Sequence, residues 1–196
     1  MGDKSRVRVY IACSLDGFIA GPDDDLSWLP GADPDPDAPE ANKDSTPPRD
    51  PAAVSYDEFM AEVGALLMGR RTHDAVAGFG VPWPYGERPV LVATHRTLEP
   101  ASPTVRAIDG DIASMIEAAK DAAGSKDVYL DGGFMIRTAL DAGLVDDLIV
   151  TMVPTILGAG HSLFAGVTAR HELELIGHHT EALGMIQLRL RPKPAA

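Results

Sequence analysis

A strand that ends in paired glycines and runs directly into a helix lies near the middle of this chain. Val128–Leu130 is a short apolar run typical of a buried strand, and Gly132-Gly133 follows it after one aspartate. Residues 134–142 then carry apolar side chains at 135, 136, 139 and 140, which is helical spacing. Glycines let a backbone approach a phosphate closely, and the free N–H groups of a first helical turn point toward it. The stretch therefore predicts either an anion site or a tight strand-to-helix turn without a ligand.

Composition indicates one ordinary globular unit. The 196 residues are 45% hydrophobic and 23% charged, which is enough for a single domain with a sizeable core. We therefore expect one domain over residues 1–196, with an irregular Pro- and Asp-rich loop at 30–51. The net charge of −12 argues against nucleic-acid partners and anionic membrane surfaces, because both are bound through surplus Lys and Arg.

Features of the chain also bear on its compartment. The single cysteine, Cys13, forms no intrachain disulfide, which suits a reducing cytoplasm. The first residues lack the apolar core of a signal peptide, and no segment reaches the about 18 apolar residues of a membrane span. These features predict a soluble, cytoplasmic protein.

Strands and helices are expected to alternate along most of the chain. The predicted strands are Arg6–Cys13, Ala65–Gly69, Pro89–Thr94, Val105–Ile108, Val128–Leu130 and Asp147–Val153. Helices are predicted to begin after Ser55, which forms a capping pattern with Glu58, after Gly69, and after a cap at Asp109 or Asp111.

The C-terminal part has a different pattern. Glu172–Ile176 and Met185–Arg191 both alternate and predict a hairpin, in which Ile186, Leu188 and Leu190 face inward and Gln187, Arg189 and Arg191 face outward. The fold class expected is therefore α/β, with a mixed sheet that is mainly parallel and becomes antiparallel at one end.

Polar groups follow three of the predicted strands, where each strand ends. The segments are Gly69-Arg70-Arg71-Thr72, Thr94-His95-Arg96 and Gly132-Gly133. Because the carboxyl ends of parallel strands share one edge, these segments are expected to meet there. Together they are suited to a dinucleotide, with its pyrophosphate between two helix N-termini and an adenosine 2′-phosphate against Arg71 and Arg96. Alternatively, the arginines are surface charges that offset the acidic balance.

Two other patterns predict no ligand. Gly158–Leu163 begins like a Rossmann fingerprint but lacks the third glycine and a following helix, so it predicts a loop. His161, His171, His178 and His179 lack the spacing of metal ligands, and no metal site is predicted. The adjacent His178 and His179 are expected to be solvated hairpin residues that face opposite ways.

Several motifs follow one another in an order known from one superfamily. They are Ala12–Ala20, Ser27–Leu29, Leu67–Thr72, Asp131–Gly133, Gly143–Asp147 and Pro154–Gly160. As an ordered set they resemble the dihydrofolate-reductase-like superfamily, and within it the reductase domain of the bifunctional riboflavin-biosynthesis deaminase–reductase and its stand-alone relatives. The resemblance implies a three-layer fold with a mainly parallel central sheet, and an NADPH-dependent reductase, commonly a homodimer, that acts on a pyrimidine- or pterin-like heterocycle.

The resemblance also implies roles for individual residues. It assigns the pyrophosphate to Gly69, Arg70, Arg71 and Thr72 together with Gly132, Gly133, Phe134 and Met135. It assigns the 2′-phosphate and adenine to Thr94, His95 and Arg96, and the nicotinamide to Ala12 and Ile19. It places Asp16, Trp28 and Asp131 near the substrate, and Asp25 is the nearest candidate for a folate-binding acid.

Departures from the family pattern leave the pathway open. Phe134 stands where dihydrofolate reductase has a third glycine, and one cysteine cannot supply the zinc signature of the deaminase half. Reducing a C=N or C=O bond requires a proton, for which Asp16 and Asp131 are the candidates. Alternatively, Asp16 stabilises a turn and Asp131 caps a helix. A non-catalytic NADPH-binding protein and a dihydrofolate reductase proper are the competing functions.

Overall fold

The computed structural model describes residues 5–30, 50–51 and 53–194. Most of the predicted 30–51 loop therefore lies outside the described residues. The elements are β1 (Val7–Ser14), β2 (Phe18–Ala20), η1 (Pro22–Asp24), α1 (Tyr56–Glu62), β3 (Val63–Gly69), α2 (Arg70–Ala77), β4 (Val90–Ala93), β5 (Val105–Ile108), α3 (Ile112–Ala123), β6 (Asp127–Asp131), α4 (Gly133–Asp141), β7 (Asp147–Val153), β8 (His161–Ser162), β9 (Leu173–Thr180), η3 (Ala182–Gly184) and β10 (Ile186–Pro192).

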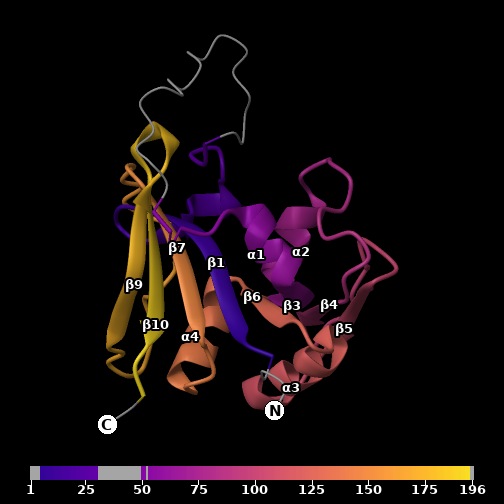
Figure 1. Ribbon diagram of the computed structural model, residues 1–196. Coiled ribbons are helices and arrows are strands. Elements are labelled where there is room, and N and C mark those ends of the chain that lie inside the picture. The colour runs from indigo at the N-terminus through magenta and orange to yellow at the C-terminus, as the bar shows by residue number, and fades with distance from the viewer. Residues whose placement is uncertain (1–4, 31–49, 52, 195–196) are drawn as a thin grey trace.

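The main sheet among these described residues has eight strands in the order β5-β4-β3-β6-β1-β7-β10-β9. The strands from β5 to β7 run parallel, whereas β10 pairs antiparallel with both β7 and β9. Figure 1 shows β9 and β10 at one end of this sheet and β4 and β5 at the other. The predicted mixed α/β sheet with a C-terminal antiparallel hairpin is confirmed.

Strand register brings the carboxyl ends of three neighbouring parallel strands to the same level. Met68 of β3 pairs with Asp131 of β6, and Gly69 of β3 pairs with Ala93 of β4. The chain leaves these three strands at one edge, which is where ligands bind in sheets of this kind.

Helices cover both faces of the sheet. On one face, α3 buries Met115, Ile116 and Ala119, and α4 buries its residues 135, 136, 139 and 140, as the helical spacing predicts. On the other face, Phe59 and Met60 of α1 and Val76 of α2 pack against β3, β4 and β6. The molecule therefore has three layers, with apolar strand residues buried on both sides.

The four α-helices of the described residues begin in two different ways. Ser55 caps α1 in a reciprocal pair with Glu58, and the carboxylate of Asp111 accepts a hydrogen bond from Ser114 N at 2.8 Å to cap α3. By contrast, α2 and α4 begin at Gly69 and Gly132 with no side-chain cap. The first-turn N–H groups of α2 and α4 are thus free of a capping side chain.

The predicted facing of the hairpin is wrong at its start. Gln187 is buried and Ile186 is exposed, the reverse of the expectation. The Gln187 amide accepts from Val54 N at 2.9 Å and donates to Val54 O at 3.0 Å, so the segment before α1 covers this position. His179, expected to be solvated, is also buried, and its Nδ1 accepts a hydrogen bond from Asp50 N. Chain segments remote in sequence set these burials.

At the amino-terminal edge of the sheet, a buried guanidinium is surrounded by carboxylates. Arg8 on β1 lies 3.1 Å from Asp147 and 3.3 Å from Asp127, contacts Glu62, and stacks over the Phe59 ring at 4.9 Å. Because β1 is a central strand, both of its faces are covered, and a charge at this position requires partners.

In the described part of the chain, no helix is both long and apolar enough to cross a membrane.

Candidate functional site

A cavity of about 1070 Å³ opens at the carboxyl edge of the parallel strands. The three polar strand ends predicted to meet all contribute to its wall, through Gly69, Thr94 and Gly132. The prediction that these segments share one edge is therefore confirmed.

Most of the residues expected to bind the cofactor line this cavity. They are Ala12, Ile19, Gly69, Arg70, Arg71, Thr72, Thr94, His95, Gly132, Gly133, Phe134 and Met135, and the candidate acid Asp131 lines it as well. Arg96, Asp16, Asp25 and Trp28 are outside the lining.

Glycine is required where the two uncapped helices meet. Gly132 has φ +88°, and a Cβ there would come within 2.4 Å of Thr72 Oγ1. A Cβ on Gly133 would lie 3.1 Å from both Ile19 Cδ1 and Ser162 O. The N-termini of α2 and α4 therefore approach each other at their backbones, and the cradle they form suits a pyrophosphate bound by N–H groups.

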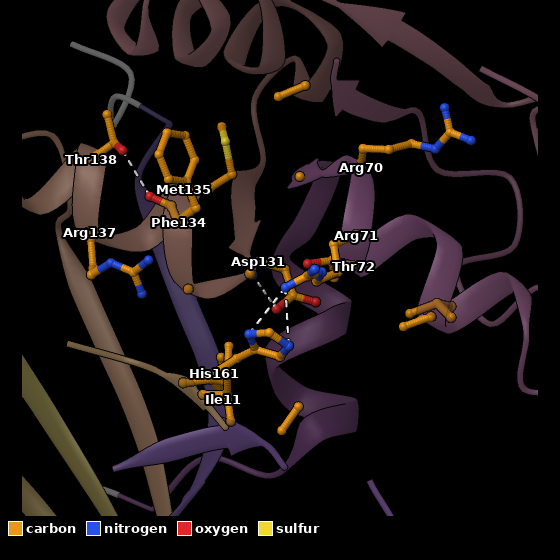
Figure 2. A pocket seen from close by; sticks show the side chains of 18 of the residues that line it. Ile11, Arg70, Arg71, Thr72, Asp131, Phe134, Met135, Arg137, Thr138 and His161 are labelled. Carbon is orange, nitrogen blue, oxygen red and sulfur yellow. Dashed lines mark hydrogen bonds between the residues drawn. The ribbon is translucent and has the colours of Figure 1, made fainter. Parts of the chain in front are cut away.

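The two consecutive arginines of α2 point in different directions (Figure 2). Arg70 donates to Asp74 at 2.7 Å and to the Thr97 carbonyl at 2.8 Å, so it lies beside the segment that follows β4. Arg71 lies with its Nη1 3.1 Å from each ring nitrogen of His161. The two side chains diverge because adjacent helical residues project about 100° apart, and the expected joint contact of Arg71 and Arg96 with a 2′-phosphate stays a prediction. Arg70 is the arginine on the Arg96 side.

Asp131 ends β6 at the cavity, beside the first glycine of the cradle. Burial raises the pKa of Asp131 to about 6, although the hydrogen bond from Gly132 N at 2.7 Å and the nearby Tyr129 hydroxyl, which itself donates to Tyr10 O, oppose the shift. A carboxyl with this pKa exchanges its proton near neutral pH, which suits acid–base chemistry.

Tyrosines surround this carboxyl group. Burial, and then the charge of Asp131, raises the pKa of Tyr56 to about 12 and raises the pKa of Tyr85 and Tyr129 as well. Tyr10, Tyr85 and Tyr129 line the cavity, and Phe59 packs edge-on against Tyr129 at 5.0 Å. This end of the cavity therefore combines aromatic surfaces with one titratable acid.

Asp16 has the contacts of a turn-stabilising residue. Its carboxylate accepts hydrogen bonds from Ser14 Oγ at 2.6 Å, Leu157 N at 3.1 Å and Gly158 N at 2.7 Å. The Ser14 hydrogen bond lowers the pKa of Asp16, so the group is ionised at neutral pH. Asp16 thus fastens the segment after β7 to the end of β1, one of the two alternatives that the sequence left open.

The two residues predicted to bind substrate are also outside the cavity wall. Asp25 accepts a hydrogen bond from Ser27 N at 3.0 Å. The indole Nε1 of Trp28 is buried with no partner in the described part of the chain. Their neighbours Asp24, Leu26 and Leu29 line the cavity instead.

Sequence reasoning missed His161 and Arg137. His161 belongs to the glycine-rich segment that was predicted to be a plain loop, but this segment forms β8 and pairs with β2. Gly160 there approaches β2 so closely that a Cβ would lie 2.1 Å from Ala20 O. Arg137, one turn into α4, donates a hydrogen bond to Ser162 O at 2.6 Å and so fixes β8 in the wall of the cavity. One sequence signal could have identified His161 as a site residue. Its segment follows β7, a parallel strand of the same sheet, and ligands bind where such strands end.

No group of three His, Cys, Asp or Glu side chains within the described ranges is arranged to hold a metal ion.

Known proteins resemble this chain over nearly its whole length. A curated protein of Bacillus subtilis (strain 168), YwjB, is 27% identical over 174 residues, which cover 89% of this chain and 91% of YwjB; it is described as uncharacterized. A second protein of that organism, YyaP, also described as uncharacterized, is 26% identical and covers 94% of each chain.

Solved structures support the same grouping. A Shewanella sp. PV-4 protein, provisionally assigned to riboflavin biosynthesis, is 30% identical with a TM-score of 0.76, and the match covers 96% of this chain and 99% of that one. The deaminase/reductase of Thermotoga maritima, named for reduction of 5-amino-6-(5-phosphoribosylamino)uracil, gives a TM-score of 0.66 at 16% identity. This match covers 97% of our chain and 57% of the Thermotoga chain, and at that identity it shows the fold.

The family assignment rests on residues 5–186, which match the family described as the RibD C-terminal domain. The resemblance inferred from the ordered motifs and the dihydrofolate-reductase-like fold are both confirmed. This chain belongs to the RibD C-terminal domain family.

Proposed function

We propose that this protein is an NADPH-dependent oxidoreductase that delivers a hydride to a pyrimidine- or pterin-like heterocycle, as a 5-amino-6-ribosylaminouracil-phosphate reductase does. The observation that carries the proposal is that two uncapped helix N-termini and a carboxyl group with a raised pKa open into one cavity. The first feature suits a pyrophosphate and the second suits proton transfer.

Different parts of the cavity wall suit different parts of the cofactor. Backbone N–H groups at Arg70–Thr72 and Gly133–Phe134 would hold the pyrophosphate. Arg70 donates to Thr97 O in the segment after β4, which also carries Arg96, so a 2′-phosphate bound there would meet two guanidinium groups. Ala12 and Ile19 line the part of the cavity nearer β1 and would contact the nicotinamide.

Asp131 would act as the proton donor. Bound NADPH would supply the hydride to a ring carbon, and the reduced C=N or C=O bond needs a proton on its heteroatom. The neutral carboxyl of Asp131 donates that proton and regains one from solvent. Tyr10, Tyr85 and Tyr129 offer aromatic surfaces on which a planar ring packs beside this carboxyl.

The comparisons support the class of reaction. The Shewanella and Thermotoga relatives are connected by name with riboflavin biosynthesis. A Corynebacterium diphtheriae protein of this fold, with a TM-score of 0.60 at 16% identity over 97% of our chain and 93% of that one, is described as pyrimidine reductase-like. We extend the proposal to a homodimer in the cytoplasm, as the family resemblance implies.

Two measurements test the proposal. NADPH and NADH are titrated by fluorescence, and the protein with NADPH is then screened for loss of absorbance at about 340 nm against aminouracils, pterins and dihydrofolate. We expect saturable NADPH binding and turnover with an aminouracil or pterin. Binding without turnover of any of these would favour a non-catalytic nucleotide-binding protein, and turnover of dihydrofolate alone would favour a dihydrofolate reductase proper.

A further inference from the structure

An acidic side chain of the protein occupies the position in which a ligand anion would meet two donors. Asp24 Oδ1 lies 3.1 Å from His161 Nε2 and 3.6 Å from Arg71 Nε. All three residues line the cavity, and Arg71 stands in the first turn of α2, beside the cradle between the two helix N-termini.

These three residues come from separate parts of the fold. Asp24 belongs to η1 after β2, His161 to β8 after β7, and Arg71 to α2 after β3. Figure 2 shows the Arg71 and His161 side chains directed toward each other at the cavity. The contact therefore joins the β2–β8 side of the cavity to its α2 side.

The backbone that presents Asp24 is strained. Asp23 and Asp24 have φ values of +58° and +62°, and non-glycine residues adopt this left-handed region at a cost. Two successive residues in this conformation are held by their surroundings, and the contacts of Asp24 with Arg71 and His161 are part of them.

We propose that Arg71 and His161 form a phosphate-binding subsite and that Asp24 is its internal competitor, which a phosphate group of the ligand displaces. The proposal deepens the function proposed above and rests on it for the identity of the ligand. A phosphate presents several oxygens to a guanidinium, whereas Asp24 offers a single oxygen to both donors. His161 is thus a residue that contacts the bound phosphate, and Asp24 is a positioning residue that lowers the affinity of the subsite for phosphate.

The exposure of these side chains determines how much the charge of Asp24 lowers the affinity for a phosphate ligand. Arg71 is 67% exposed and Asp24 is 44% exposed, so the bond between them is weak and yields to a ligand that the helix N-termini also hold. Exposed ion pairs of this kind correspond to about a two- to five-fold change in a binding constant.

The experiment compares Asp24→Asn with Asp23→Asn in the full-length protein. Asparagine keeps the size of aspartate and tolerates the left-handed backbone, so both variants are expected to fold, which circular dichroism checks. Asp23 is a matched control, because it shares the conformation and charge of Asp24 but is outside the cavity lining. Dissociation constants for NADPH and for inorganic pyrophosphate are measured by calorimetry.

We expect Asp24→Asn to bind both probes about two- to five-fold more tightly than the wild type, and Asp23→Asn to match the wild type. His161→Gln should bind both probes more weakly, and Asp24→Asn should have no further effect in a background that carries both Arg71→Gln and His161→Gln. Unchanged or weaker binding by Asp24→Asn, or an equal gain in Asp23→Asn, would overturn the proposal.

The probes separate this inference from the proposed function. If pyrophosphate shows the pattern and NADPH does not bind, the subsite stands and the reductase proposal fails. If NADPH binds and turns over but Asp24→Asn behaves like the wild type, the competitor role fails and the reductase proposal stands. If neither probe binds to any variant, both fail.

Discussion

Charged side chains have opposite environments at the two edges of the parallel sheet. At the amino edge, Arg8 is 1% exposed and is enclosed by Asp127, Asp147 and Glu62. At the carboxyl edge, Arg71 is largely exposed. Asp131 lies at the cavity there, and its pKa is raised by burial, with no nearby cation among the described residues that lowers it. Charges at the first edge satisfy one another in buried pairs, whereas at the second edge the pair of Arg71 with Asp24 is exposed and a ligand can replace it.

The helix starts differ in the same way. Ser55 and Asp111 satisfy the first turns of α1 and α3 from within the chain. Gly69 and Gly132 leave the first turns of α2 and α4 open at the cavity. The expected ligand site therefore lies where the N–H groups of a first helical turn have no hydrogen-bond acceptor from a capping side chain.

The largest effect is expected from Asp131→Asn on turnover. Losing a general acid should lower kcat/KM about 10²- to 10⁴-fold. In the wild type, turnover should fall as the pH rises through about 6, because the carboxyl loses its proton there, and the variant should lack this dependence. The measurement is a pH–rate profile.

Asp16→Asn is the matched control for this profile. It removes a carboxylate that hydrogen-bonds to Ser14 and Gly158 outside the cavity wall, so it should keep the wild-type pH dependence. A profile that disappears in Asp16→Asn and persists in Asp131→Asn would reverse the assignment.

Removal of the buried guanidinium at the other edge should affect stability alone. Arg8→Met leaves the buried Asp127 and Asp147 with one cationic partner each, Arg6 and Arg189, and we expect a cost of about 3 kcal/mol or less in the free energy of unfolding. Arg6→Met removes a 38% exposed guanidinium from the same cluster and should cost about 1 kcal/mol or less. Urea unfolding measures both. A changed NADPH affinity in folded Arg8→Met would show that the two edges are coupled.

Glycine at the cradle permits a test of close backbone approach. Gly132→Ala adds a Cβ 2.4 Å from Thr72 Oγ1 at a φ of +88°, and strain of this kind costs about 1–3 kcal/mol. We expect at least about ten-fold weaker NADPH binding, as each ten-fold corresponds to about 1.4 kcal/mol. Gly143→Ala, with φ +66° and nothing within 4 Å of its Cβ, should lose some stability and keep its affinity. Equal affinity loss in both would point to general destabilisation.

The fold was largely predictable because its signals are local. The Ser55–Glu58 capping pair, the apolar positions of α4 and the paired glycines each lie within one turn or one short stretch of sequence. The Gln187 inversion was not predictable, since it depends on Val54, which is 133 residues away in the chain.

The site was predictable as a set of strand ends and less so as a set of side chains. Gly69, Thr94 and Gly132 meet because parallel strands share an edge. Which of Arg70 and Arg71 faces which segment depends on the rotation of α2 about its axis, which composition does not reveal. His161 meets Arg71 across 90 residues, through a two-residue strand too short to leave an alternating pattern.

The same Asp131→Asn variant should gain stability while it loses activity. The folded-state pKa of about 6 exceeds the ordinary value of 3.8, so the stability that Asp131 contributes is fully present below about pH 4 and is lost as the pH rises through 6. Replacement by a neutral amide should therefore raise the free energy of unfolding at about pH 8 by about 2 kcal/mol and change it little at about pH 4. Thermal unfolding at the two pH values measures this, and a loss at about pH 8 would contradict a raised pKa.

The smallest effect concerns cofactor choice. Arg96→Ala should weaken NADPH about ten-fold and NADH little, because only NADPH carries the 2′-phosphate. Parallel fluorescence titrations measure the ratio. Equal losses for both cofactors would remove Arg96 from the 2′-phosphate site and leave Arg70 as the guanidinium beside that segment.

A crystal structure of the protein with NADPH tests the central claim most directly. The account predicts the pyrophosphate within hydrogen-bond distance of backbone N–H groups in the first turns of both α2 and α4, with the nicotinamide toward Ala12 and Asp131. A cofactor bound on another face, or one whose phosphates contact neither helix N-terminus, would contradict it.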